Sequence, residues 1–120
     1  MTAVGTNSHK CFHSTNLDQG LIMSPNYPEK YLIAINCTWV LTNWKPGVSQ
    51  IVLHLNDFET EKDADGVIIS DEKGNVINEI SGSSIPNDIH FGGKQLVITF
   101  LSDATNTLKG FSLSYDIQGN

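Results

Sequence analysis

The chain has 120 residues, which suits one domain and is too short for two comfortable hydrophobic cores. Apolar residues make up 39% of it and charged residues 17%, a composition typical of an extracellular β-rich domain and not of a helical cytosolic one. The formal net charge of −6, with only seven scattered basic residues, argues against a nucleic-acid binder and favours a basic partner.

The N-terminal segment, residues 1–9, lacks the apolar stretch of a signal peptide. We expect it to be a flexible leader or residues added for expression, followed by a single domain over 10–118. No window of the chain approaches the ~20 apolar residues of a membrane span. His9 and His13 are four residues apart, but no helical pattern surrounds them. They are interpreted as exposed leader residues and not as zinc ligands.

Strands are predicted where apolar and polar residues alternate, and this alternation is clear in 51–56, 96–100 and 111–117. Weaker candidates, each bounded by Pro, Gly, Asn or Asp, are 20–23, 37–41, 67–70 and 76–80. A hairpin turn is expected at 71–75, and all four prolines fall outside these strands: Pro25, Pro28, Pro46 and Pro86. Short strands without helical segments between them predict an all-β fold, an antiparallel β-sandwich or jelly roll.

The two cysteines, Cys11 and Cys37, are compatible with one disulfide. Such a bond would close a loop of roughly 25 residues and contribute about 3 kcal/mol. On spacing alone, a reduced pair of buried thiols is equally compatible. Asn36-Cys37-Thr38 is an Asn-x-Thr sequon, which carries glycan only in the secretory pathway. It shifts the balance slightly toward the disulfide and makes Asn36 a candidate glycosylation site.

Five segments, in chain order, match motifs of a known family. Residues 20–28 are similar to G-x-I-x-S-P-N-Y-P, and 37–41 are similar to a cysteine followed by x-W-x-I. Residues 53–61 are similar to L-x-F-x-D-F-x-L-E, and 65–69 to D-Y-V-x-I. Residues 100–111 resemble F-x-S-D-x-S-N followed by G-F. The family is the CUB domain, and the resemblance covers Cys11 to Ile117. It implies a CUB-like β-sandwich in an extracellular or secreted interaction module that is not an enzyme.

The resemblance also implies a calcium site, because a subset of CUB domains holds Ca²⁺ between acidic loops at one end of the sandwich. The implied positions are the carboxylates of Glu61, Asp65 and Asp103, the backbone carbonyl of Thr105, the side-chain oxygen of Asn106, and the hydroxyl of Tyr31, which steadies the glutamate without touching the ion. Calcium takes six to eight oxygen ligands at about 2.3–2.6 Å, which such a set can supply. The remaining oxygens could accept charge-assisted hydrogen bonds from a Lys or Arg of a protein partner.

The sequence departs from the family pattern at the second disulfide. The segment from Glu61 to Asp65 is shortened and has no cysteine, and the F-C-G tripeptide is matched by Ile80-Ser81-Gly82. Both partners of that bond are therefore missing together. We expect this half of the sandwich to be less constrained, by roughly a few kcal/mol if no packing compensates.

Other candidate sites in the sequence have weaker support. Asp63-Ala64-Asp65-Gly66 is similar to the start of an EF-hand loop, but the distal glutamate and the flanking helices are missing. His54 is predicted to face solvent from a strand, and His90 to lie in a turn. The larger aromatic residues are interpreted as core or rim packing and not as a sugar-stacking platform: Trp39, Trp44, Tyr27 and Phe58.

Catalysis has no positive signal, since the sequence shows no nucleophile elbow, phosphate-binding glycine loop or Cys-His pairing. Two alternatives to a calcium-dependent interaction module stay open. One is a carbohydrate-binding, lectin-like sandwich with a glycan as ligand. The other is a targeting domain of a larger secreted protease.

Overall fold

The structure is a computed structural model that describes residues 9–45, 47, 49–103 and 105–119. Within these residues it contains nine strands and no helix. In chain order they are β1 (His9–Thr15), β2 (Gln19–Met23), β3 (Ile35–Thr42), β4 (Ser49–Glu59), β5 (Gly66–Asp71), β6 (Val76–Ile80), β7 (Ile89–Phe91), β8 (Gln95–Leu101) and β9 (Gly110–Gly119). No described segment therefore forms a helix long and apolar enough to cross a membrane.

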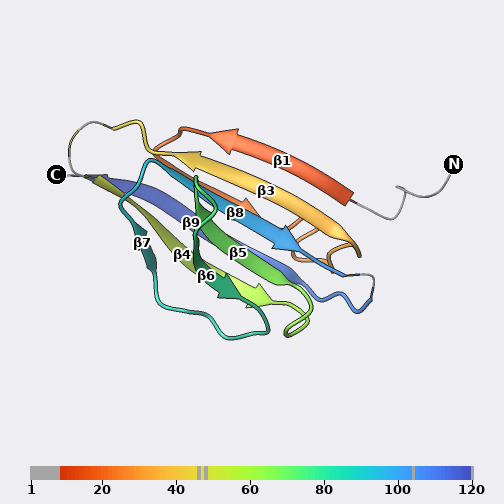
Figure 1. The fold of residues 1–120 in the computed structure, drawn as a ribbon. Coiled ribbons are helices and arrows are strands. Elements are labelled where there is room, and N and C mark those ends of the chain that lie inside the picture. The colour runs from red at the N-terminus through yellow and green to blue at the C-terminus, as the bar shows by residue number, and fades with distance from the viewer. Residues whose placement is uncertain (1–8, 46, 48, 104, 120) are drawn as a thin grey trace, which may run out of the picture.

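The strands form two sheets that stack face to face (Figure 1). The five-stranded sheet has the order β1-β3-β8-β5-β6, and the four-stranded sheet has the order β2-β9-β4-β7. Neighbouring strands are antiparallel except β1 and β3, which run parallel with Cys11 opposite Cys37. The predicted all-β, antiparallel sandwich is confirmed.

The core lies between the sheets because each long strand turns alternate side chains inward. In β3, Cys37, Trp39 and Leu41 are buried, while the residues between them face outward. The aromatic centre is Phe111, whose ring meets Trp39 at 5.8 Å and Phe100 at 5.2 Å, both edge to face. Burial of each such side chain contributes about 1.5–3 kcal/mol, so this layer holds the two sheets together.

The seven predicted strands correspond to β2, β3, β4, β5, β6, β8 and β9, and the hairpin turn at 71–75 joins β5 to β6. Strands β1 and β7 were not predicted. His90 lies in β7, so its placement in a turn was wrong, whereas His54 is exposed on β4 as predicted. His9 and His13 are exposed but belong to β1. The predicted leader, except His9, and Pro46 lie outside the described residues.

The end of the sandwich that carries the acidic loops is held by the segment between β2 and β3. Its backbone runs beside the loop that follows β8: Ala34 N–H donates to the carbonyl of Asp103 at 2.7 Å, and Tyr31 N–H donates to the carbonyl of Leu108 at 2.9 Å. The hydroxyl of Ser102 accepts from Ile35 N–H at 2.8 Å. These bonds fix the loop after β8 against the end of the five-stranded sheet.

Candidate metal centre

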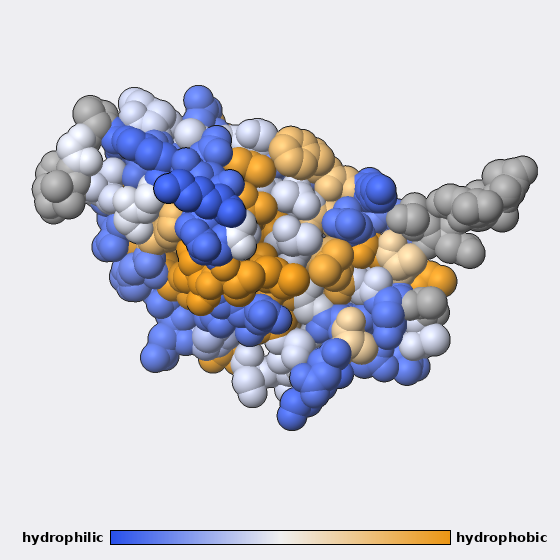
Figure 2. All heavy atoms as spheres, in the orientation of Figure 1, coloured by the Kyte–Doolittle hydropathy of each residue, from blue (hydrophilic) through white to orange (hydrophobic). Residues whose placement is uncertain are grey.

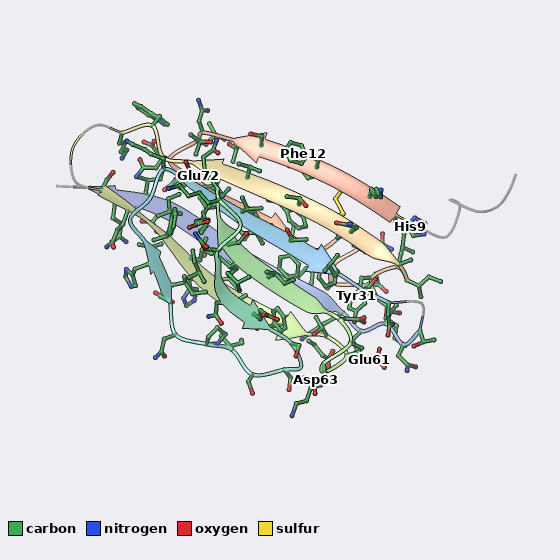
Figure 3. All side chains as sticks on the ribbon, viewed as in Figure 1. His9, Phe12, Tyr31, Glu61, Asp63 and Glu72 are labelled. Atoms are coloured by element: carbon green, nitrogen blue, oxygen red, sulfur yellow. A yellow bond between two sulfur atoms is a disulfide. The ribbon has the colours of Figure 1, made fainter. Side chains whose placement is uncertain are left out.

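Three carboxylates from two loops meet at this end of the sandwich. Glu61 and Asp65 belong to the turn between β4 and β5, and Asp103 belongs to the loop between β8 and β9. One oxygen atom from each lies within 4.8 Å of the other two. Asp65 is 3% exposed, Glu61 is half-buried and Asp103 faces solvent. Figure 3 shows Glu61 and Tyr31 at this end, beside the turn that carries Asp63.

The shortened β4–β5 segment closes as one tight turn. The carbonyl of Glu61 accepts hydrogen bonds from Ala64 N–H at 3.2 Å and Asp65 N–H at 2.9 Å, and Asp63 has a left-handed φ of 63°. Because the turn is short, Glu61 and Asp65 lie on its two sides with their carboxylates close together.

Buried Thr60 ties this turn to the segment after β6, the two segments in which the resemblance implied a second disulfide that this sequence lacks. Its hydroxyl donates to the carbonyl of Asp65 at 3.1 Å and accepts from Gly82 N–H at 3.0 Å. Its own N–H donates to the carbonyl of Gly82 at 2.8 Å, and Ser81 Oγ accepts from Asp63 N–H at 3.2 Å. Three of these hydrogen bonds join the β4–β5 turn to Ser81 and Gly82, and the bond to the Asp65 carbonyl closes the turn itself. Sequence reasoning missed the role of Thr60, and its only signal was its place next to Glu61.

Tyr31 connects the two acids of the turn. Its buried hydroxyl donates to Asp65 Oδ2 at 2.5 Å and accepts from the backbone N–H of Glu61 at 3.2 Å. The hydroxyl therefore contacts the main chain of Glu61 and also the side chain of Asp65, and the second contact was not expected. Burial, and next the hydrogen bond to Asp65, raise the pKa of Tyr31 above its ordinary value. The hydroxyl consequently remains a donor at neutral pH.

The loop after β8 brings its own polar groups to the cluster. Asp103 N–H donates to Asp65 Oδ1 at 2.7 Å, and Asp103 Oδ1 accepts from Thr105 N–H at 3.0 Å. Asn106, with a left-handed φ of 51°, donates from Nδ2 to Glu61 Oε2 at 2.8 Å. The amide thus presents its nitrogen to the cluster, whereas an ion ligand would have to present its oxygen.

Within the described part of the chain, no ion pair involves the three clustered acids. The ion pairs among the described residues are Lys45 with Asp18, His54 with Asp88, and Lys109 with Asp57. Two unit charges 4.8 Å apart repel by roughly 3 kcal/mol at an effective dielectric constant of about 20. Separately, Glu61 Oε1 is buried and has no hydrogen-bond partner. A buried acceptor of this kind costs about 1–3 kcal/mol, and more when it is charged.

These features fit a hard divalent cation. Calcium is bound by carboxylate, amide and carbonyl oxygens, and this end of the molecule offers three carboxylates. Such an ion would satisfy the unpartnered Glu61 Oε1 and remove the repulsion among the acids. The donor set contains no histidine or cysteine, so it does not resemble a zinc site.

The cysteine pair forms the disulfide Cys11–Cys37, which links the edge strand β1 to its neighbour β3 and appears as the yellow bond in Figure 3. Asn36, in β3 beside it, is exposed.

Among the aromatic residues, Trp39 and Phe58 pack in the core as predicted. Tyr27 is half-buried at the rim, where its hydroxyl donates to Asp57. Trp44 is 55% exposed and does not pack in the core.

Comparison with known proteins identifies this two-layer fold. The model of the CUB domain family matches residues 11–115, so the chain belongs to the CUB domain family. It is 34% identical to mouse Tolloid-like protein 1 over 116 residues, which cover 91% of this chain and 11% of that protein. It is 35% identical to zebrafish Neuropilin-1a over 107 residues, which cover 80% of this chain and 11% of that protein.

Among solved structures, the MASP-1 CUB2 domain superposes with a TM-score of 0.75 at 23% identity, covering 91% of this chain and 98% of that one. The chain spans about a tenth of the length of the two curated relatives. CUB domains are in general non-catalytic interaction modules. In broad terms, the relatives indicate that this chain is an extracellular protein-interaction module. The limits 10–118 of the domain stay a prediction.

Proposed function

We propose that this CUB domain binds Ca²⁺ through Glu61, Asp65 and Asp103, and that the calcium-bound loops engage a Lys or Arg of an extracellular protein partner. The observation that carries the proposal is the meeting of these three carboxylates within 4.8 Å, with the buried Glu61 Oε1 left without a partner. The MASP-1 CUB2 domain, which shares the fold, was solved bound to Ca²⁺. Calcium is therefore the first ion to test.

Additional ligands would come from the loop after β8. Asn106 already touches Glu61, so turning its amide would exchange a hydrogen-bond donor for a ligand oxygen. Thr105, whose N–H is held by Asp103, would contribute its backbone carbonyl. Tyr31 would hold Asp65 and the turn in place without contacting the ion. The bound cation supplies fixed positive charge, which orders the two loops and leaves ligand oxygens able to accept hydrogen bonds.

Thermal unfolding tests the calcium site. With a dissociation constant of about 10⁻⁴ M, typical of extracellular modules, ~10 mM Ca²⁺ stabilises the domain by about 2.7 kcal/mol. The midpoint of unfolding should then rise by roughly 10 °C relative to a chelator. Asp103→Ala should lose this shift, because it removes one of the three proposed carboxylate ligands. Asp103 is the exposed member of the trio, so its removal leaves the core intact. An equal shift in Asp103→Ala and wild type, or none in wild type, would reject the site.

The basic partner can be tested with a small probe. N-acetyl-lysine amide carries the ammonium group, and N-acetyl-norleucine amide is its uncharged match. In a calcium-containing NMR titration, the lysine probe should shift the amide signals of Glu61, Asp65 and Asp103, and the norleucine probe should not. The effect should weaken as salt rises, because exposed ionic contacts are screened. Equal shifts with both probes, or shifts confined to other surfaces, would rule out this binding mode.

A further inference from the structure

The outer face of the five-stranded sheet carries a candidate modification site that is separate from the acidic loops. Asn36-Cys37-Thr38 is the only Asn-x-Ser/Thr triplet in the sequence. It lies in β3, the second strand of the sheet, where the side chains alternate between the two faces. Cys37 points into the core, so Asn36 and Thr38 point outward, and Asn36 is exposed. The disulfide at Cys37 therefore does not bury the acceptor amide.

The neighbours of Asn36 on this face are not all polar. In the sheet register Asn36 lies between Lys10 of β1 and Leu101 of β8, and Phe12 lies beside Thr38. Phe12 is 66% exposed and Leu101 is 36% exposed. Directly paired side chains of neighbouring strands lie about 4.5–5.5 Å apart, which is within reach of the first sugar on Asn36. Figure 2, viewed onto this face, shows separate apolar patches among hydrophilic surface, the largest over β5 and β6.

We propose that Asn36 carries an N-linked glycan and that this glycan covers the exposed apolar side chains of Phe12 and Leu101. The proposal rests on the extracellular location contained in the proposed function, but not on the calcium site. Asn36–Thr38 is paired on both sides, with β1 and with β8. A glycosyl transferase can therefore reach the sequon only before β3 joins the sheet, and the folded domain has only to tolerate the sugar. The outward-facing Asn36 allows that.

The position of Asn36 also limits the surface that a protein partner could contact near the acidic loops. Ala34, two residues before Asn36, donates its N–H to the carbonyl of Asp103. A glycan on Asn36 thus stands next to the acidic loops, on the side of the five-stranded sheet. In the described residues, the side chain of Asn36 takes no part in the hydrogen bonds of the carboxylates.

The test is secretion of the domain from animal cells, with the intact mass measured before and after peptide-N-glycosidase treatment. Because the sequence has one sequon, a glycan-sized loss of mass in wild type, with the Asn-to-Asp change mapped to position 36, supports the proposal. Asn36→Gln and Thr38→Ala should both lack the glycan. Thr38→Ser, which keeps the hydroxyl of the sequon, should retain it. A secreted, folded wild type whose mass the enzyme does not change overturns the proposal.

A separate measurement tests whether the glycan covers the apolar side chains of Phe12 and Leu101. Native deglycosylation should increase the fluorescence of an apolar-surface dye such as ANS, and the increase should be smaller in Phe12→Ser. If the mass shows the glycan but the dye signal does not change, the covering role is overturned while the modification site stands. The calcium-induced shift of the unfolding midpoint should be the same before and after deglycosylation. Failure of the calcium proposal and failure of this one are therefore distinguishable.

Discussion

Neutralising Glu61 should make the calcium-free domain more stable and at the same time abolish its response to calcium. Glu61, Asp65 and Asp103 have oxygens within 4.8 Å, and two unit charges at that distance repel by roughly 3 kcal/mol at an effective dielectric constant of about 20. Solvent screens part of this repulsion, because Glu61 is half-buried and Asp103 is exposed. Removing the charge of Glu61 should therefore stabilise the calcium-free state by about 1–2 kcal/mol.

The substitution Glu61→Gln keeps the size of the side chain and its acceptor for the Asn106 amide. It also adds an N–H₂ group that can donate to the neighbouring carboxylates. In chelator, its unfolding midpoint should exceed that of wild type by roughly 4–8 °C. With ~10 mM Ca²⁺ the order should reverse, because only wild type gains binding energy.

Glu72→Gln is the matched control for this experiment. Glu72 is exposed in the β5–β6 hairpin at the opposite end of the sandwich (Figure 3), and its substitution removes the same charge. It should leave both midpoints within about 2 °C of wild type. A Glu61→Gln variant less stable than wild type in chelator, or one that responds to calcium as wild type does, would refute the account of a repulsive cluster held by an ion.

Three further predictions concern the groups around this site. Tyr31→Phe removes the hydroxyl shared by Asp65 and the Glu61 N–H, and should lower the free energy of unfolding in urea by about 1–3 kcal/mol, with the smallest loss at saturating calcium. Thr60→Val removes the bonds to Gly82 N–H and to the carbonyl of Asp65, and should cost about 1–3 kcal/mol in the same assay, while Thr60→Ser should cost clearly less. Equal losses in the two Thr60 variants would contradict the hydrogen-bonding role. The hydrogen bond from Tyr27, and next the contact with Lys109, lower the pKa of Asp57 below its ordinary value of 3.8. The stability that Asp57 contributes is therefore present above that value and is lost as pH falls through the lower folded-state pKa. In acid titrations below about pH 4, the unfolding free energy of Asp57→Asn should change less with pH than that of wild type.

The sheets could largely be predicted because alternation is a local property. Strands such as β8 and β9 alternate apolar and polar residues, and the core that follows is the observed one. Strand β1 does not alternate in this way, and most of its residues are exposed. It is a strand because β3 offers it a free edge and Cys37 a disulfide, and neither is visible in the local sequence. Strand β7, with three residues, is too short for any period to show.

The acidic site was reached through family motifs and not through spacing. Asp103 is far from Glu61 in the sequence, and only the pairing of β5 with β8 brings their loops together. Details that depend on side-chain direction could not be predicted. Tyr31 contacts the carboxylate of Asp65 as well as the backbone of Glu61, and Asn106 presents its nitrogen. The two hydrogen bonds between Thr60 and Gly82 depend on the tertiary approach of Gly82, which no local pattern encodes.

Calorimetric titration of Ca²⁺ into the chelator-treated domain tests the central proposal most directly. The account predicts one ion per chain, a dissociation constant at or below about 10⁻³ M, and complete loss of the binding heat in Asp103→Ala. A wild-type titration indistinguishable from that of Asp103→Ala would contradict it.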